Sequence, residues 1–332
     1  FGLIANARSH AAAGVLKVGE RQEPEPQAGE VLVKLAFSGI NPSDVKSRAA
    51  RPLVGEIVIP HSDGAGVIVK IGSGVAPSRL GERVWIWNGQ WKRPFGTAAQ
   101  YIALPSEQAV SLPSNVDFEA GACIGIPLLT AWHALSLLGD VTGKTLLVTG
   151  AASSVGDYVT QLASRCGGAT VIGTVGSDLK AQYSRRAGAS QTIDYKIEDV
   201  AERILSITDG KGVDGVIDMD FSSTAPLATT GCIANHATIV SYGSNVAGEV
   251  ALPYREFMFR CLSLRQFAIY ELTPEQRAAA LTGVCDVLAA GVLDHTIAEI
   301  FELEDIIQAH QAVECGKGGK PGKIVLHIPD SQ

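Results

Sequence analysis

A predicted strand, a turn of small residues and a predicted helix follow one another at residues 145–165 of the 332-residue chain. The turn, 151–156, ends in glycine where a dinucleotide-binding GxGxxG turn ends, although Ala and Ser stand in its two earlier glycine positions. Side chains this small still let a pyrophosphate approach backbone N–H groups at the positive end of a helix. We therefore predict a nucleotide-binding turn. Its predicted contacts are Ala152, Ser153, Ser154 and Val155.

The end of the next predicted strand indicates which nucleotide fits. A site that prefers NAD(H) places Asp or Glu there, about 20 residues past the turn, to bind the ribose hydroxyls. This chain reads Gly-Thr-Val-Gly at 173–176, and Ser177 and Lys180 follow. A hydroxyl and an ammonium can bind a 2′-phosphate, so we predict NADPH, with Gly173, Ser177 and Lys180 in its site. The alternative for Lys180 is a solvated helix residue.

A parallel sheet must position these residues. From residue 146 onward, strand patterns alternate with helical patterns, and three of the helical segments end in glycine, which is common after a helix. The six strand candidates are LLVTG, TVIGT, QTID, VDGVID, HATIVSYG and SLRQFAIY. This pattern predicts an α/β fold with a doubly wound, six-stranded parallel Rossmann sheet, which we assign to residues 123–270.

The remaining residues form a different pattern. Residues 30–81 carry aliphatic and β-branched runs broken by Gly and Pro, which predict an antiparallel, barrel-like domain. After Tyr270 we expect one helix, capped by Thr273 with Pro274 in its first turn, and then the strand GKIVLHI. We expect this C-terminal segment to rejoin the first domain, which then consists of residues 1–122 and 271–332.

Composition narrows the classes of partner. The 27 Lys and Arg against 34 Asp and Glu give a net charge of -7, which disfavours nucleic acid and anionic membrane surfaces as partners. The apolar runs are shorter than the roughly 20 residues of a membrane helix, so we expect a cytoplasmic protein. Six scattered cysteines without a CxxC pair make a structural zinc site unexpected.

Several longer segments carry a family resemblance. They are GEVLVKLAFSGINPSDVKSR, IPHSDGAGVIVKIGSGV, GERVW, FGTAAQYIALP, GACIGIPLLTAWHAL, GAASSVG and AGASQTIDY. Together they resemble the zinc-independent medium-chain dehydrogenase/reductases, and above all the quinone oxidoreductase or zeta-crystallin group. The resemblance implies a GroES-like β-barrel-type catalytic domain built from both chain ends, a central Rossmann domain, NADPH in the cleft, and a homodimer or homotetramer.

The resemblance also allows the metal ligands to be compared. Zinc-dependent relatives carry a Cys after the second strand and a His-Glu pair further on. The corresponding stretches of this chain are Gly39-Ile40-Asn41-Pro42 and His61-Ser62-Asp63, with Ser62 in place of the expected His. No cysteine precedes Cys123, and the lobe that binds structural zinc is missing. His61 is one residue out of register, so we expect a turn or core histidine. We predict no metal ligand.

Without zinc, the chain lacks a Lewis acid that could ionise an alcohol. Reduction of an electron-poor acceptor is therefore favoured over oxidation of an alcohol. A quinone or conjugated carbonyl compound accepts hydride at carbon if it is aligned and offered hydrogen-bond donors. The resemblance implies that Asn41 faces the nicotinamide and the substrate carbonyl, and that Thr130 binds near the cofactor. A turn-forming Asn41 and a helix-capping Thr130 are the alternatives. Lys46 stands where many members have tyrosine, and a cation there could change the acceptor preference or supply a proton; the alternative is a lysine that points to solvent.

The resemblance assigns further residues to the cofactor site. It places Tyr195 over the 2′-phosphate pocket, beside Lys180, and brings a basic side chain from GKGGKPGK (Lys317, Lys320 and Lys323) towards the adenosine phosphate. We assign none of these three lysines, because such loops are usually solvated. The segments that flank the nicotinamide contain Ser241, Gly243, Phe267 and Ile269. All four residues could instead belong to the strand core.

The sequence thus predicts an NADPH-dependent enzyme that transfers hydride to a small-molecule quinone or other conjugated carbonyl acceptor without zinc. One alternative is a reductase of the double bond of an enone, a 2-alkenal or an enoyl thioester. A second is a non-catalytic, crystallin-like NADPH-binding protein, for which RNA is a poor partner because of the net charge.

Overall fold

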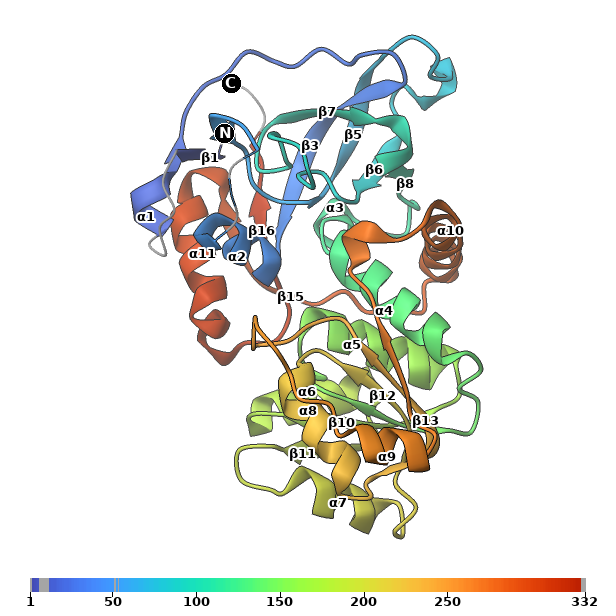
Figure 1. Cartoon of the computed structure of the whole chain (residues 1–332). Coiled ribbons are helices and arrows are strands. Elements are labelled where there is room, and N and C mark those ends of the chain that lie inside the picture. Colours follow the sequence, from blue (N-terminus) through green and yellow to red (C-terminus); the bar gives the residue numbers. More distant parts are fainter. Residues whose placement is uncertain (1, 6–11, 51, 53, 330–332) are drawn as a thin grey trace. The chain divides into compact units, whose positions relative to one another are not determined.

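The structure, a computed structural model, describes residues 2–5, 12–50, 52 and 54–329 (Figure 1). The chain divides into two compact units. Unit 1 consists of Phe1–Ile126, Leu288–Gly291 and His295–Gln332, and unit 2 of Pro127–Val287 and Val292–Asp294. Most of helix α10 (Pro274–Ala290) belongs to unit 2, whereas the sequence pattern groups it with the first domain.

Unit 2 contains a parallel sheet of six strands in the order β11-β10-β9-β12-β13-β14. The strands are β9 (Thr145–Val148), β10 (Thr170–Val175), β11 (Gln191–Asp194), β12 (Val213–Asp218), β13 (Ile233–Ser241) and β14 (Ser263–Gln266). This is the doubly wound order, which reverses direction between β9 and β12 and binds ligands at the carboxyl ends of the strands there. The predicted six-stranded Rossmann sheet is confirmed.

Helices precede and connect these strands. They are α4 (Gly125–Leu138), α5 (Ser154–Gln161) with its π-helical continuation Leu162–Cys166, α6 (Asp178–Ala187), α7 (Val200–Ile207), α8 (Phe221–Thr224) and α9 (Tyr254–Phe259). Ser153, Ser177 and Asp199 cap the N-termini of α5, α6 and α7 with their side-chain oxygens. Gly188 ends α6 with a φ of 119°, as the glycine signal predicts.

Unit 1 contains a sheet in the order β15-β16-β3-β5-β6-β8, with β7 also paired to β3. The strands are β3 (Glu30–Ile40), β5 (Asp63–Ile71), β6 (Arg83–Ile86), β7 (Tyr101–Pro105), β8 (Ala109–Ser111), β15 (Ile297–Glu302) and β16 (Lys323–His327). The pairs are antiparallel except β15 with β16. Because β16 pairs with β3, the predicted return of the C-terminal strand to the first domain is confirmed.

Shorter elements complete unit 1. A second sheet has the order β2-β1-β4, from β2 (Leu16–Val18), β1 (Gly2–Ala5) and β4 (Ile57–Val58). The helices are α1 (Ala12–Val15), α2 (Pro42–Ala50), α3 (Phe118–Gly121) and α11 (Ile306–Glu314). Helices α2 and α11 lie side by side (Figure 1). None of the helices in the described ranges is long and apolar enough to cross a membrane.

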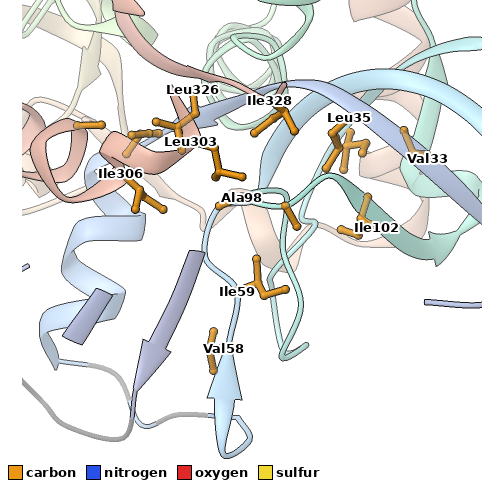
Figure 2. Close-up of a cluster of buried hydrophobic side chains, with 14 of the residues drawn as sticks. Val33, Leu35, Val58, Ile59, Ala98, Ile102, Leu303, Ile306, Leu326 and Ile328 are labelled. Atoms are coloured by element: carbon orange, nitrogen blue, oxygen red, sulfur yellow. The ribbon is translucent and has the colours of Figure 1, made fainter. Parts of the chain in front are cut away.

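The core of unit 1 joins segments from both ends of the chain. Figure 2 shows Val33 and Leu35 of β3 in one apolar cluster with Ile306 of α11 and Leu326 of β16. Each of these four side chains is at most 3% exposed. Burial of such side chains contributes roughly 1.5–3 kcal/mol each, so the C-terminal segment is part of the first core rather than an appendage.

Candidate active site

The predicted nucleotide-binding turn follows β9 and opens α5. Ser153 Oγ accepts a hydrogen bond from Gly156 N at 3.0 Å, which leaves the hydroxyl proton of Ser153 as a donor. The backbone N–H groups of Ala152, Ser154 and Val155 have no acceptor among the described residues. Three unpaired N–H groups and a hydroxyl at the N-terminus of a helix form a set of donors for a pyrophosphate.

Close packing holds this turn in place. A Cβ atom on Gly156 would lie 2.3 Å from Gly150 O, so a side chain there would push the turn away from the helix. Gly150 itself has a φ of 62°, which favours glycine. Gly173, a predicted cofactor residue, is buried in β10, where a Cβ atom would lie 2.7 Å from Ala151 Cβ. The structure therefore gives Gly173 a packing function behind the turn.

Two lysines, Lys180 and Lys196, lie near the end of β10. Ser177 caps α6 by accepting from Lys180 N at 3.4 Å, and Lys180 is half-buried in the first turn of that helix. Tyr195, which is 53% exposed, lies beside Gly176, because a Cβ atom on that glycine would be 2.7 Å from the Tyr195 hydroxyl. The same Cβ atom on Gly176 would lie 3.2 Å from Lys196 Cε. Lys196 was not predicted from the sequence.

These contacts bring the predicted residues Ser177, Lys180 and Tyr195 to one end of β10, with Lys196 as a second lysine nearby. The exposed Asp178 is a neighbouring carboxylate, but the residues at the strand end, Val175 and Gly176, carry none. Two ammonium groups and a hydroxyl fit the 2′-phosphate of NADPH better than a ribose diol.

A second group of predicted residues lines a cavity of about 490 Å³ in unit 2. Ser241, Gly243 and Phe267 lie on its wall, together with residues of the loop 244–252. Gly243 packs against Met219, whose carbonyl oxygen would be 2.6 Å from a Cβ atom. Ile269 does not line this cavity, and it is 6% exposed.

The sixth predicted strand is too long. It was predicted to include Phe267 and Ile269, but β14 ends at Gln266. The apolar pattern continues past this point because Ile269 is buried in the turn that follows.

Thr130 lies on α4 in the same unit and is 3% exposed. This position is compatible both with the predicted contact to the cofactor and with the alternative, a hydrogen bond to its own helix backbone.

Unit 1 contains a buried polar cluster built around Asn41, at the end of β3. Asn41 Nδ2 donates to Asp63 Oδ2 at 2.8 Å. Lys323 Nζ donates to Asn41 Oδ1 at 2.8 Å and to Asp63 Oδ2 at 2.5 Å. Asn41, Asp63 and Lys323 are 3%, 0% and 2% exposed. Asp63 Oδ1 accepts from the backbone of Ile126 at 2.8 Å, so both carboxylate oxygens are satisfied.

Asp63 and Lys323 were not predicted as site residues. Lys323 was considered only as one lysine of the glycine-rich loop, yet it is the first residue of β16 and fully buried. The pairing of Ile324 with Ile40 brings it next to Asn41, and Gly39 leaves room for its stem, because a Cβ atom there would lie 2.9 Å from Lys323 Cε. A lysine directly before the apolar run IVLHI was the available signal.

Asp44, on the first turn of α2, borders this cluster. Its Oδ2 atom accepts from the backbone N–H of Asn41 at 2.7 Å. Burial, and then the charge of Asp63, raise the pKa of Asp44 to about 7, although Asn41 and Lys323 act in the opposite direction. Lys46, two residues further on, is exposed and does not line the cavity of unit 1 that Asp44 lines.

His61 takes part in a buried chain of hydrogen bonds. Arg48 Nη1 lies 3.3 Å from His310 Nδ1, and a guanidinium can only donate. His310 therefore carries its proton on Nε2 and donates it to His61 Nε2, 2.9 Å away. His61 in turn donates from Nδ1 to Ser38 Oγ at 2.9 Å. Both imidazoles are thus neutral, each in one tautomer.

The chain continues to the polar cluster. Ser38 Oγ lies 2.8 Å from Thr97 Oγ1, which donates to the backbone carbonyl of Asp63 at 2.6 Å. At the other end, Arg48 forms an ion pair with Glu314. His61 has a φ of 76°, a strained conformation that its buried contacts maintain. Among the described residues, no group of three or more His, Cys, Asp or Glu side chains could hold a metal ion.

Comparison with known proteins adds family information. Residues 27–114 match the alcohol dehydrogenase GroES-like domain, and residues 154–283 match the zinc-binding dehydrogenase domain. A quinone oxidoreductase of Pseudomonas aeruginosa is 32% identical over 302 residues, which cover 89% of this chain and 91% of that protein. A 2-haloacrylate reductase of a Burkholderia species is 30% identical over 314 residues, covering 91% of each.

A solved structure is similar throughout. The crystal structure of Escherichia coli quinone oxidoreductase complexed with NADPH superimposes with a TM-score of 0.84 at 26% sequence identity. The match covers 98% of this chain and 99% of that one. The similarity therefore extends over both units, each with its own sheet.

Proposed function

Because the chain belongs to the medium-chain dehydrogenase/reductases and is quinone oxidoreductase-like, we propose that it reduces a quinone or another conjugated carbonyl acceptor without zinc. It is an oxidoreductase, and its cofactor is NADPH. When bound, NADPH supplies the hydride. The chain's own residues must then bind the cofactor, orient the acceptor and deliver a proton.

The residues present fit the cofactor. The N–H groups of Ala152, Ser154 and Val155 and the hydroxyl of Ser153 would bind the pyrophosphate. Ser177, Lys180, Tyr195 and Lys196 would surround the 2′-phosphate. Charge-assisted hydrogen bonds from the two lysines would favour NADPH over NADH.

The observation that carries the proposal is the buried cluster of Asn41, Asp63 and Lys323. By the resemblance, Asn41 and Asp63 belong to the two stretches that correspond to the zinc-binding segments of zinc-dependent relatives, and here both contact the ammonium of Lys323. A fixed positive charge already compensates Asp63, so a second cation would be repelled from the same oxygens. This supports a reaction without zinc, and hence an acceptor that needs no strong Lewis acid.

We propose that Asn41 orients the acceptor carbonyl and that Thr130 binds the cofactor. Both side chains can donate a hydrogen bond without titrating. The principal alternative within the family is reduction of a conjugated carbon–carbon double bond, favoured by the similarity to the 2-haloacrylate reductase. The remaining alternative is an NADPH-binding protein without turnover.

The test is oxidation of NADPH, followed by its near-ultraviolet absorbance, in the presence of a metal chelator. Simple 1,4-benzoquinones and open-chain enones serve as acceptors, each repeated with NADH. The expected result is turnover of quinones at a rate that the chelator does not lower. Turnover of enones alone would favour the double-bond reductases, and loss of activity with chelator would contradict zinc independence. NADPH binding without turnover of any acceptor would favour the binding protein.

A further inference from the structure

Tyr242 lies at the carboxyl end of the parallel sheet of unit 2, two strands away from the strand that leads into the nucleotide-binding turn. It follows β13, and its N–H donates to the carbonyl oxygen of Asp218, the last residue of β12, at 3.1 Å. Thr149, which precedes the turn, donates in the same way to Ile217 of β12 at 3.0 Å. These contacts fix the backbone of Tyr242 at the edge of the sheet where a doubly wound fold binds its ligand.

The two ends of the Tyr242 side chain have different surroundings. The residue lines the cavity of about 490 Å³ in unit 2, and its ring centroid lies 6.4 Å from that of Phe267. The hydroxyl, by contrast, is buried and has no hydrogen-bond partner among the described residues. Such groups are uncommon in folded proteins, because an unpaired buried hydroxyl costs free energy. A partner that becomes available when a ligand binds would account for it.

The hydroxyl of Ser153, in the nucleotide-binding turn, is a neighbour that can accept from Tyr242. Burial, and then the charge of Asp218, raise the pKa of Tyr242, although the side chain of Ser153 acts in the opposite direction. The phenol therefore keeps its proton and can donate it in a hydrogen bond. Ser153 Oγ accepts from Gly156 N at 3.0 Å, and its second lone pair can accept once more.

We propose that Tyr242 is a positioning residue of the cofactor site, which donates a hydrogen bond to Ser153 Oγ while Ser153 donates to the pyrophosphate. The proposal rests on the proposed function, which places the pyrophosphate at this turn. With both lone pairs of Ser153 Oγ occupied, by Gly156 and Tyr242, the Ser153 proton can point only to the ligand. A hydroxyl that accepts a hydrogen bond is also polarised and becomes a stronger donor. The Tyr242 hydroxyl is itself too deeply buried to contact a phosphate, so it acts through Ser153.

The first test removes the Tyr242 hydroxyl and determines which part of the cofactor loses affinity. Calorimetry measures the binding of NADPH, of 2′-phospho-ADP-ribose, which lacks the nicotinamide, and of 2′-AMP, which lacks the pyrophosphate as well. Tyr242→Phe should lower the affinity for NADPH and for 2′-phospho-ADP-ribose by the same factor, about three- to tenfold, as expected for the loss of one hydrogen bond. The affinity for 2′-AMP should not change.

Other patterns of affinity would overturn the proposal. A loss confined to NADPH would place the effect of Tyr242 at the nicotinamide, and an equal loss for all the ligands would indicate a general disturbance of the sheet. Unchanged affinities would show that the hydroxyl takes no part in binding. Tyr254→Phe, the same change at a tyrosine of α9 that is 67% exposed, is the matched control and should bind every ligand as the wild type does.

A double-mutant cycle tests whether Tyr242 acts through Ser153. Ser153→Ala removes the hydroxyl between Tyr242 and the phosphate, so it should itself weaken the binding of 2′-phospho-ADP-ribose. Adding Tyr242→Phe to Ser153→Ala should then cause no further loss. If the two losses multiply, Tyr242 acts by another route and the proposal is wrong. Normal binding by Ser153→Ala would show that this hydroxyl does not contact the pyrophosphate, and the proposal would fail with that contact.

Thermal unfolding separates positioning from support of the fold. Because the Tyr242 hydroxyl has no partner in the structure, its removal leaves no buried group unpaired. Without any ligand, Tyr242→Phe should therefore unfold at the temperature of the wild type or above it. The rise in unfolding temperature on addition of NADPH should be smaller in the variant, since weaker binding stabilises less. A lower unfolding temperature of the variant without ligand would show that the hydroxyl supports the fold itself, and would overturn the proposal.

The proposal and the proposed function fail in different ways. A wild-type protein that binds NADPH but reduces no acceptor would refute the proposed function, whereas the binding results for Tyr242→Phe would stand. A wild-type protein that reduces quinones or enones, combined with unchanged affinities in Tyr242→Phe, would refute the positioning by Tyr242 and leave the proposed function intact.

Discussion

The Nε2 atoms of His61 and His310 lie 2.9 Å apart, although 249 positions separate the two residues in the sequence. Each imidazole is neutral and held in one tautomer, because Arg48 donates to His310 at the far ring nitrogen. The pair joins α11 to the turn that precedes β5, and through Ser38 and Thr97 to the backbone of Asp63. Protonation of either ring would replace an acceptor with a donor and break this chain.

We expect the protein to lose stability in mild acid for this reason. Burial lowers the pKa of His310 to about 3 and that of His61 well below its usual range. Because both folded-state values lie below the unfolded value of about 6.5, the unfolded state binds more protons in between. Stability therefore falls as the pH drops below about 6.5, and for His310 the loss continues to about pH 3.

Urea unfolding at a series of pH values measures this effect. Each unit of difference in pKa corresponds to about 1.4 kcal/mol, so the two histidines should together remove several kcal/mol in acid. The double variant His61→Gly with His310→Leu lacks both groups, and glycine suits the φ of 76° at residue 61. Its unfolding midpoint should depend less on pH below 6.5 than that of the wild type. The same dependence in both proteins would contradict the assignment.

The sequence identified the elements whose patterns are local. All six strands of the parallel sheet were predicted, because each is a short aliphatic run between turn residues. The end of β14 was misplaced, because Phe267 and Ile269 continue the apolar pattern after the backbone has left the sheet. The resemblance directed attention to Asn41, but no local pattern indicates that Lys323 contacts it. That contact depends on the register between β16 and β3, which pairs residues far apart in the chain.

Removal of either lysine at the end of β10 should weaken NADPH binding selectively. Lys180→Ala and Lys196→Ala should each reduce NADPH affinity at least about tenfold and leave NADH affinity unchanged, since a hydrogen bond to a charged group contributes roughly 1.5–3 kcal/mol. Titration of cofactor fluorescence gives both affinities. Lys211→Ala, at an exposed position of the same unit, is the control. Equal losses for NADPH and NADH would show that the lysines do not bind the 2′-phosphate.

The buried lysine of unit 1 should matter for stability far more than an exposed one. Lys323→Met leaves Asp63 fully buried without its counter-ion, and loss of one partner of a buried pair costs about 3–5 kcal/mol. Lys320→Met, three residues earlier, removes only an exposed pair with Glu299 and should cost less than about 1 kcal/mol. Chemical denaturation of both variants provides the comparison.

A compensating change distinguishes charge from packing at this site. Adding Asp63→Asn to Lys323→Met removes the uncompensated carboxylate, so the double variant should regain part of the lost stability. If it unfolds as readily as Lys323→Met alone, the loss arises from the space left by the lysine stem and not from the buried charge.

The glycine that ends the nucleotide-binding turn should tolerate no side chain. In Gly156→Ala the new Cβ would lie 2.3 Å from Gly150 O and 2.9 Å from Ala151 Cα, both backbone atoms that can move only if the turn shifts. A shift of the turn displaces the N–H groups of Ala152 and Ser154, so NADPH affinity should fall at least about tenfold, as expected for a change of about 1.4 kcal/mol or more. Gly55→Ala, whose Cβ would meet Pro94 Cβ at an ordinary 3.4 Å, is the matched control and should bind NADPH normally. Wild-type NADPH affinity in Gly156→Ala would mean that these backbone groups do not bind the pyrophosphate.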